Sequence, residues 1–109
     1  MDRFIGRENI KFYGARLRTE ADMATRQRLH SLLLEEEDRL GADREFIAVI
    51  EQTISAFDAL IDLQRKLVTM LERGRLDGDG RAKALLVGLV ESRAVYRNYH
   101  RRMLRSLVS

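Results

Sequence analysis

The chain has 109 residues, which is enough for one folded domain and too few for two. Hydrophobic residues make up 45% and charged residues 34%, a balance typical of a soluble folded protein and not of a disordered tail or a fibre. Cysteine is absent, which excludes disulfides, thiolate nucleophiles and zinc–thiolate sites. Since proline is also absent and glycine numbers only seven, we expect a single all-helical domain over residues 1–109.

Hydropathy and charge along the chain indicate the cellular compartment in which the protein is expected. No apolar stretch approaches the roughly 18 residues of a membrane-spanning helix, and residues 1–12 carry charges where a signal peptide has its apolar core. We therefore expect a cytoplasmic protein without a membrane partner. The net charge of +3 divides into +3 over residues 1–34, −7 over residues 35–64 and +7 over residues 65–109.

Two shorter helices are predicted at the N-terminus, over about residues 8–19 and 22–40. Asp22 is predicted to be the N-cap of the second, because its carboxylate can accept the free N–H groups of the first helical turn. Gly41 is suited to end that helix, and Asp43 is suited to cap the next. The predicted buried faces consist of Ile10, Tyr13, Leu17, Leu29, Leu32, Leu33 and Leu40.

Two long helices are predicted to follow, over about residues 43–73 and 81–107. The loop of residues 74–80 is rich in turn formers, and a short loop forces two long helices into an antiparallel hairpin. The expected fold class is an all-α bundle built on this hairpin. Coiled-coil spacing defines its seam, which consists of Ile47, Ile50, Ile54, Phe57, Ile61, Gln64, Val68 and Leu71.

Folding the chain at this loop predicts a register, with Phe57 opposite Tyr96 and Val68 opposite Leu86. The acidic half of the first long helix then lies beside the basic half of the second, so opposite charges are expected to meet within the fold. Further apolar residues flank the seam, so this helix is expected to touch several neighbours. These residues are Phe46, Val49, Ala56, Leu60, Leu63, Leu67 and Met70.

Acidic clusters and histidines offer little chemistry. The run 35–38 has four successive carboxylates, which fan around a helix instead of converging on one ion, so we interpret it as a solvated face. Residues 77–80 resemble the start of a calcium loop but lack its later ligands, and are interpreted as a turn. Neither His30 nor His100 stands at a catalytic or metal-binding spacing from other such residues. Both are expected to pack at the core boundary. We expect no catalytic residue, cofactor or metal ion.

Two glycines, Gly14 and Gly88, lie inside predicted helices, where glycine costs about 1 kcal/mol relative to alanine. Close approach of a neighbouring helix is the preferred explanation for both. The remaining feature with functional character is a cluster near the C-terminus in which arginines alternate with tyrosines, a combination able to grip phosphates and stack on bases. The candidate residues for binding a protein partner or a polyanion are Arg93, Tyr96, Arg97, Arg101, Arg102 and Arg105, with Tyr99 interleaved.

Residues 9–40 resemble a short helical segment that recurs in alphaproteobacterial proteins and has no known activity. The pattern consists of Asn9-Ile10, Tyr13, Leu17, Glu20-Ala21-Asp22, Arg26, Leu29, Leu32-Leu33 and Glu35-Glu36-Glu37. Similar segments often carry proline after the aspartate, where this chain has Met23. The resemblance implies helices on both sides of Asp22 and no particular function.

These observations favour a non-enzymatic helical module for protein–protein interaction or regulation. The wide apolar arc, on hairpin helices longer than the N-terminal helices can cover, favours a homodimer. The alternative is a nucleic-acid-associated regulator that binds through the arginine-rich end of the last helix. Binding to a DNA or RNA duplex that weakens steeply with salt separates the alternative from the first hypothesis.

Overall fold

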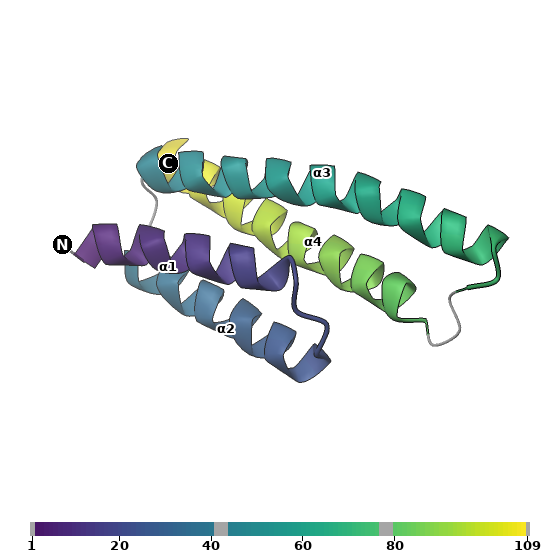
Figure 1. The fold of residues 1–109 in the computed structure, drawn as a ribbon. Helices are drawn as coiled ribbons and strands as arrows, with labels where there is room; N and C mark the ends of the chain where they lie inside the picture. The colour runs from purple at the N-terminus through teal and green to yellow at the C-terminus, as the bar shows by residue number, and fades with distance from the viewer. Residues whose placement is uncertain (1, 41–43, 77–79, 109) are drawn as a thin grey trace.

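Four helices and no strand make up the parts of the chain that the computed structural model describes, residues 2–40, 44–76 and 80–108. They are α1 (Asp2–Leu17), α2 (Met23–Leu40), α3 (Arg44–Arg73) and α4 (Arg81–Val108). Successive helices run in opposite directions, and both ends of the chain lie opposite the loop that joins α3 to α4 (Figure 1). The predicted all-α fold is confirmed.

The α3–α4 hairpin forms the long axis of the molecule, and the predicted pairing of Phe57 with Tyr96 is confirmed. The rings of Phe57 and Tyr96 lie 5.5 Å apart, centroid to centroid. Nearer the loop, Lys83 Nζ lies 3.6 Å from Glu72 Oε1. Gln64, the polar residue of the seam, is buried and donates from Nε2 to the carbonyl of Ala82 at 2.9 Å, so its amide is satisfied within the hairpin.

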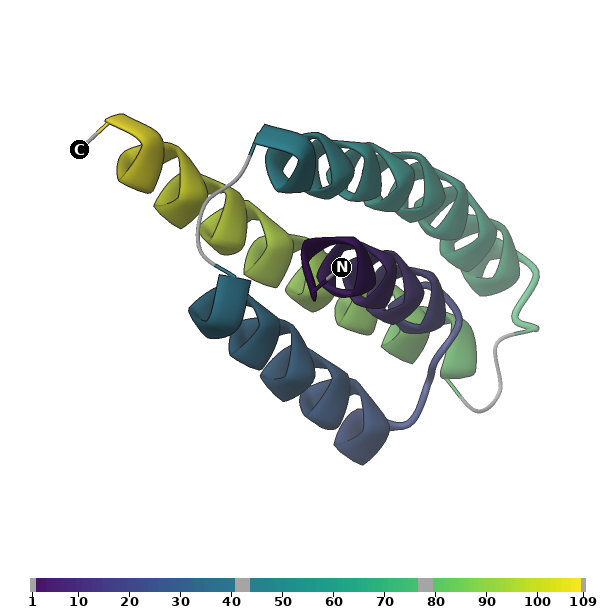
Figure 2. The ribbon, with the colours of Figure 1, turned by 90° about the vertical axis from the view of Figure 1, so that its left-hand side faces the viewer.

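The two N-terminal helices cover the hairpin from one side. Helix α1 packs against α2 and α3, and α2 packs against α1 and α4, so the four helices form an up-and-down bundle (Figure 2). The core comprises Ile10, Leu17, Leu29, Leu33, Phe46, Ile47, Val49, Ile50, Phe57, Ile61, Leu89, Tyr96, Tyr99 and Met103.

The break between α1 and α2 falls where the sequence predicts it. Asp22 Oδ2 accepts from the Thr25 backbone N–H at 2.9 Å and from its hydroxyl at 2.6 Å, which confirms the predicted N-cap. The Thr25 hydroxyl and then its N–H lower the pKa of Asp22. Glu20 is also a local capping group, since it accepts from the Asp22 N–H and from Arg16 Nε, each at 3.0 Å. The first of these bonds contributes most to lowering the pKa of Glu20.

Helix α1 is longer than predicted, since it starts at Asp2 and not near residue 8. Residues 2–7 show no amphipathic spacing, so the pattern did not predict a helix there. They contain no proline, however, and each added residue extends the backbone hydrogen bonding of the helix. The proposed roles of Gly41 and Asp43, and most of the calcium-like turn at 77–80, lie outside the described residues.

Helix α3 ends in a left-handed residue. That residue is Arg75, with φ of 55°, and not the preceding Gly74. The Leu76 N–H bonds to the Leu71 carbonyl at 2.8 Å and the Arg75 N–H to the Glu72 carbonyl at 3.2 Å, the paired bonds of a Schellman motif. A side chain at Gly74 would press on Leu76, which folds back over it at 3.3 Å.

The prediction of a solvated face at residues 35–38 is wrong for Glu36. Its side chain is buried between α1 and α2, where Oε1 accepts from Asn9 Nδ2 at 3.1 Å. Helix α2 has its hydrophobic face at Leu29 and Leu33, and Glu36 continues that face by one turn. Glu35 and Glu36 therefore point in different directions, Glu35 to solvent and Glu36 inward.

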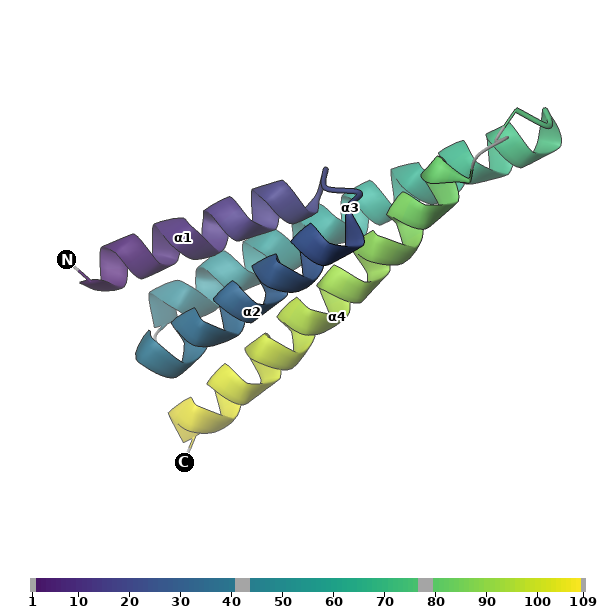
Figure 3. The ribbon, with the colours of Figure 1, turned by 90° about the horizontal axis from the view of Figure 1, so that it is seen from below.

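The hairpin extends well beyond its cover. Helix α3 has 30 residues, while α1 has 16 and ends level with the middle of the hairpin (Figure 3). The predicted wide arc is buried in the first half, at Phe46 and Val49. In the second half the same arc is bare, with Leu63 62%, Leu67 43% and Met70 68% exposed. The prediction that α3 touches several neighbours thus holds within one chain only up to about Phe57.

Candidate functional site

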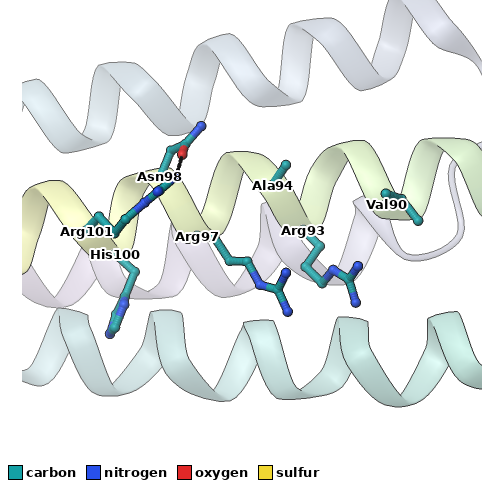
Figure 4. Close-up of a pocket in the computed structure, with 7 residues that line it drawn as sticks. All are labelled: Val90, Arg93, Ala94, Arg97, Asn98, His100 and Arg101. Atoms are coloured by element: carbon teal, nitrogen blue, oxygen red, sulfur yellow. Dashed lines mark hydrogen bonds between the residues drawn. The ribbon is translucent and has the colours of Figure 1, made fainter.

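An open groove of about 610 Å³ runs along the outer face of α4 (Figure 4). Its lining comes from α4 alone, at the spacing of one helical face. The residues are Val90, Arg93, Ala94, Arg97, Asn98, His100 and Arg101. Three of the predicted partner-binding or polyanion-binding residues, Arg93, Arg97 and Arg101, therefore lie together.

Two of the arginines in the groove are directed along the surface toward α3 (Figure 4). Arg93 Nη1 donates to Asp58 Oδ1 at 2.9 Å, and Arg97 Nη2 donates to the same oxygen at 3.4 Å. The Arg93 side chain is only 17% exposed, whereas that of Arg97 is 51% exposed. The expected meeting of the acidic flank of α3 with the basic flank of α4 is thus confirmed, and it reduces the charge that the groove offers to a ligand.

The outer part of the groove is more open. Arg101 Nη2 donates to Asn98 Oδ1 one turn earlier, and both side chains are exposed. His100 is half-buried at the boundary, as predicted, with Nε2 3.9 Å from Glu51 Oε2. A carboxylate, and not only arginines, therefore faces this imidazole. Arg102 and Arg105 lie on the exposed surface of the last turns.

The predicted role of Tyr96 at a binding surface is wrong. Tyr96 is fully buried against Phe57, and its hydroxyl donates to the Ile10 carbonyl at 3.3 Å. Burial raises the pKa of Tyr96 above its usual value. Tyr99 is 1% exposed. Alternation along the sequence misled the prediction, because on a helix the two tyrosines face the core while the arginines face outward. The groove therefore has no aromatic platform for stacking bases.

A second polar cluster, which the sequence analysis missed, lies inside the bundle around Arg26. Arg26 is 3% exposed, and its guanidinium has four acceptors in two other segments. Nη1 donates to the carbonyls of Leu17, at 2.6 Å, and Glu20; Nη2 donates to the Gly88 carbonyl, at 2.6 Å, and to Ser92 Oγ. A positive charge thus satisfies carbonyls at the end of α1, where the helix dipole favours a cation, and ties that end to α4.

His30 completes this cluster through a bond of 2.9 Å between Nε2 and Ser92 Oγ. Ser92 Oγ thus accepts from Arg26 and pairs with the His30 imidazole, whose tautomer sets which of these two groups donates. Burial, and then the nearby Arg26 charge, lower the pKa of His30, against a smaller opposing effect of Glu91. Burial likewise lowers the pKa of Arg26.

One signal in the sequence could have revealed Arg26. It precedes the buried Leu29 and Leu33 by three and seven residues, on the same helical face, so an arginine stands at a core position. Opposite it lies a glycine within a helix. A side chain at Gly88 would come within 2.8 Å of Arg26 Nε, and one at Gly14 within 2.9 Å of Thr53 Cγ2. The close approach predicted for both glycines is confirmed.

The chemistry open to these clusters is limited. The hydroxyl of Ser92 is adjacent to an imidazole, but the residue is 0% exposed. The described residues hold no group of three or more metal-ligating side chains. Within the same residues, no helix has both the length and the apolar character needed to cross a bilayer. No family model, curated protein or solved structure shows significant similarity to this chain.

Proposed function

We propose that this protein is a non-enzymatic, cytoplasmic interaction module that forms a homodimer. The observation that carries the proposal is the bare apolar arc of α3, where Leu63, Leu67 and Met70 are 62%, 43% and 68% exposed. Neighbouring large aliphatic side chains on one helical face are a common mark of a protein-binding surface. The first half of α3 uses the same arc for packing within the chain.

The pairing of charges supports a protein partner over a polyanion. Arg93 and Arg97 share Asp58, so a phosphate binding there must compete with a carboxylate already in place. The tyrosines that could stack on bases lie in the core.

The state of Ser92 and His30 supports a role without catalysis. A nucleophilic hydroxyl must meet its substrate, yet Ser92 is fully buried and its oxygen accepts from Arg26. Arg26 also anchors α1 to α4, so exposing Ser92 requires opening the bundle.

Sedimentation equilibrium of the purified chain over a wide concentration range tests the proposal. The expected result is a molar mass that rises from one chain to two as concentration increases. A mass of one chain at millimolar concentration contradicts the homodimer.

Polyanion binding is the second candidate, favoured by the exposed arginines along the outer part of the α4 groove. Titration with a DNA duplex and an RNA duplex at about 50 mM and about 200 mM salt tests it, because neutralising several phosphates makes affinity fall steeply with salt. Arg101→Gln and Arg105→Gln are expected to weaken such binding and to leave the molar mass unchanged. Absence of binding at low salt removes this candidate.

A further inference from the structure

We propose that a stripe of α3, defined as Leu60, Leu63, Leu67 and Met70, is the surface on which a second copy of this chain docks, with the two α3 helices antiparallel about a twofold axis. Leu63, Leu67 and Met70 are exposed, and Leu60, at the end of the stripe, is partly buried against the core. This inference rests on the proposed homodimer and names its interface.

The stripe continues an interface that already exists within the chain. Thr53 and Ala56 precede it at the same heptad positions, and Thr53 packs against α1, where a Cβ at Gly14 would lie 2.9 Å from its Cγ2. Helix α1 ends at Leu17, whereas α3 extends well beyond the end of α1, up to Arg73 (Figures 1 and 3). Because a helix packs along the first half of α3, we infer that another helix packs along the exposed second half.

The spacing of the stripe points to a second copy as that helix. Its four residues are separated by three, four and three positions, so the pattern reads the same in both directions. A twofold interface requires a patch that is complementary to itself. In an antiparallel pair, Leu63 lies opposite Leu67 of the partner subunit, and Leu60 lies opposite Met70 of the partner subunit.

The flanks of the stripe agree with such a pair. Asp62 and Lys66 lie on the side of α3 away from α4, and both are exposed. Neither falls at a seam position, so the charges stay in water at the rim while aliphatic side chains form the centre.

The size of the bare face sets the strength of the dimer. The uncovered part of α3 is about 20 Å long, and with the adjoining turns of α4 about 20 Å wide. Pairing two such faces buries on the order of 1,000 Å² in all, at the low end for specific interfaces. The dimer is therefore weak and reversible, and forms as concentration rises.

The interface is tested with Leu67→Lys and a matched control, Leu34→Lys. Leu67 is 43% exposed and Leu34, on α2, is 44% exposed, so the two variants add the same charge at the same degree of exposure. Circular dichroism checks that both fold. In sedimentation equilibrium, Leu67→Lys is expected to weaken dimerisation at least tenfold, and Leu34→Lys is expected to match the parent chain.

The antiparallel direction is tested by disulfide trapping, which the absence of native cysteine makes clean. Under mild oxidation, a mixture of Leu63→Cys and Leu67→Cys is expected to form a disulfide-linked heterodimer faster than either variant links to itself. Faster self-linking of each variant indicates parallel helices and overturns the proposed geometry.

The possible failures are distinct. If the parent chain is a monomer at all concentrations, the proposed homodimer fails together with this interface. If the parent chain dimerises and Leu67→Lys dimerises equally well, the homodimer stands and the stripe is excluded as its interface.

Discussion

The two halves of α3 have the same pattern of apolar residues and opposite surroundings. Near Phe46 and Val49 the arc is buried under α1, while at Leu63 and Met70 it faces solvent. The difference arises from the length of a neighbouring helix and not from the residues of α3 itself. A repeating apolar pattern thus shows which face of a helix can be buried, whereas the partner that buries it depends on the rest of the chain.

Truncating one apolar side chain in each half of α3 tests the difference between the buried and the exposed half most directly. Phe46→Ala is expected to lower the free energy of unfolding by about 3–5 kcal/mol, because it removes a fully buried ring. Leu67→Ala is expected to lower it by less than about 1 kcal/mol. Urea unfolding of dilute protein measures both. Equal losses contradict the contrast between the halves.

Within the covered half, Arg26→Ala is expected to cost about 2–4 kcal/mol, because it leaves buried acceptors without their charged donor. Arg26→Lys is expected to restore only part of the loss, since one ammonium cannot reproduce the planar fork that joins two segments. Arg28→Ala, at an exposed position of the same helix, is the control, with a change within about 0.5 kcal/mol. Thermal and urea unfolding compare the three variants.

Gly14→Ala tests the contact between α1 and α3. Alanine favours the helix by about 1 kcal/mol, but its methyl group would meet Thr53 Cγ2 at 2.9 Å, so a net loss of about 1–2 kcal/mol is expected. Thr53→Ser removes that methyl group and keeps the hydroxyl that donates to Val49. The double variant is expected to recover part of the loss in a double-mutant cycle. Strict additivity would show that the two side chains do not meet.

The cluster at His30 predicts a dependence on pH. Its pKa in the fold lies below the ordinary 6.5, because of burial and Arg26, so below pH 6.5 the unfolded chain binds the proton more readily than the folded chain. The free energy of unfolding is therefore highest above pH 6.5 and falls as pH drops toward the folded-state value. Unfolding measured from pH 8 to pH 5 tests this. In His30→Gln, the free energy of unfolding is expected to fall less steeply as pH drops. An unchanged slope in that variant would show that another group causes the pH dependence.

The smallest expected effect lies at the tip of the hairpin. Arg75 adopts φ of 55°, which glycine accepts without steric cost, so Arg75→Gly is expected to raise the free energy of unfolding by about 0.5–1 kcal/mol. Arg73→Gly, inside the last turn of α3, is expected to lower it. A loss in both variants would contradict a strained Arg75.

The elements that depend on local chemistry could be predicted from the sequence. Asp22 caps α2 even though Met23 replaces the proline of similar segments, and the turn formers after Arg73 close the hairpin in the expected register. Burial of individual polar groups was predicted less well. Tyr96 and Glu36 point inward because they continue the buried faces of their own helices, seven residues after Leu89 and three residues after Leu33. Arg26 depends on acceptors up to 66 residues away, a separation that no short motif spans.

The reach of Arg26 also has a consequence for the order of folding. Its guanidinium gives up water only after the last turn of α1 and the middle of α4 have both arrived, because its acceptors belong to those two segments. Until then, solvation of the cation opposes the docking of α2. Packing of α2 is thus coupled to the placement of both α1 and α4, and the bundle is expected to melt in a single cooperative transition.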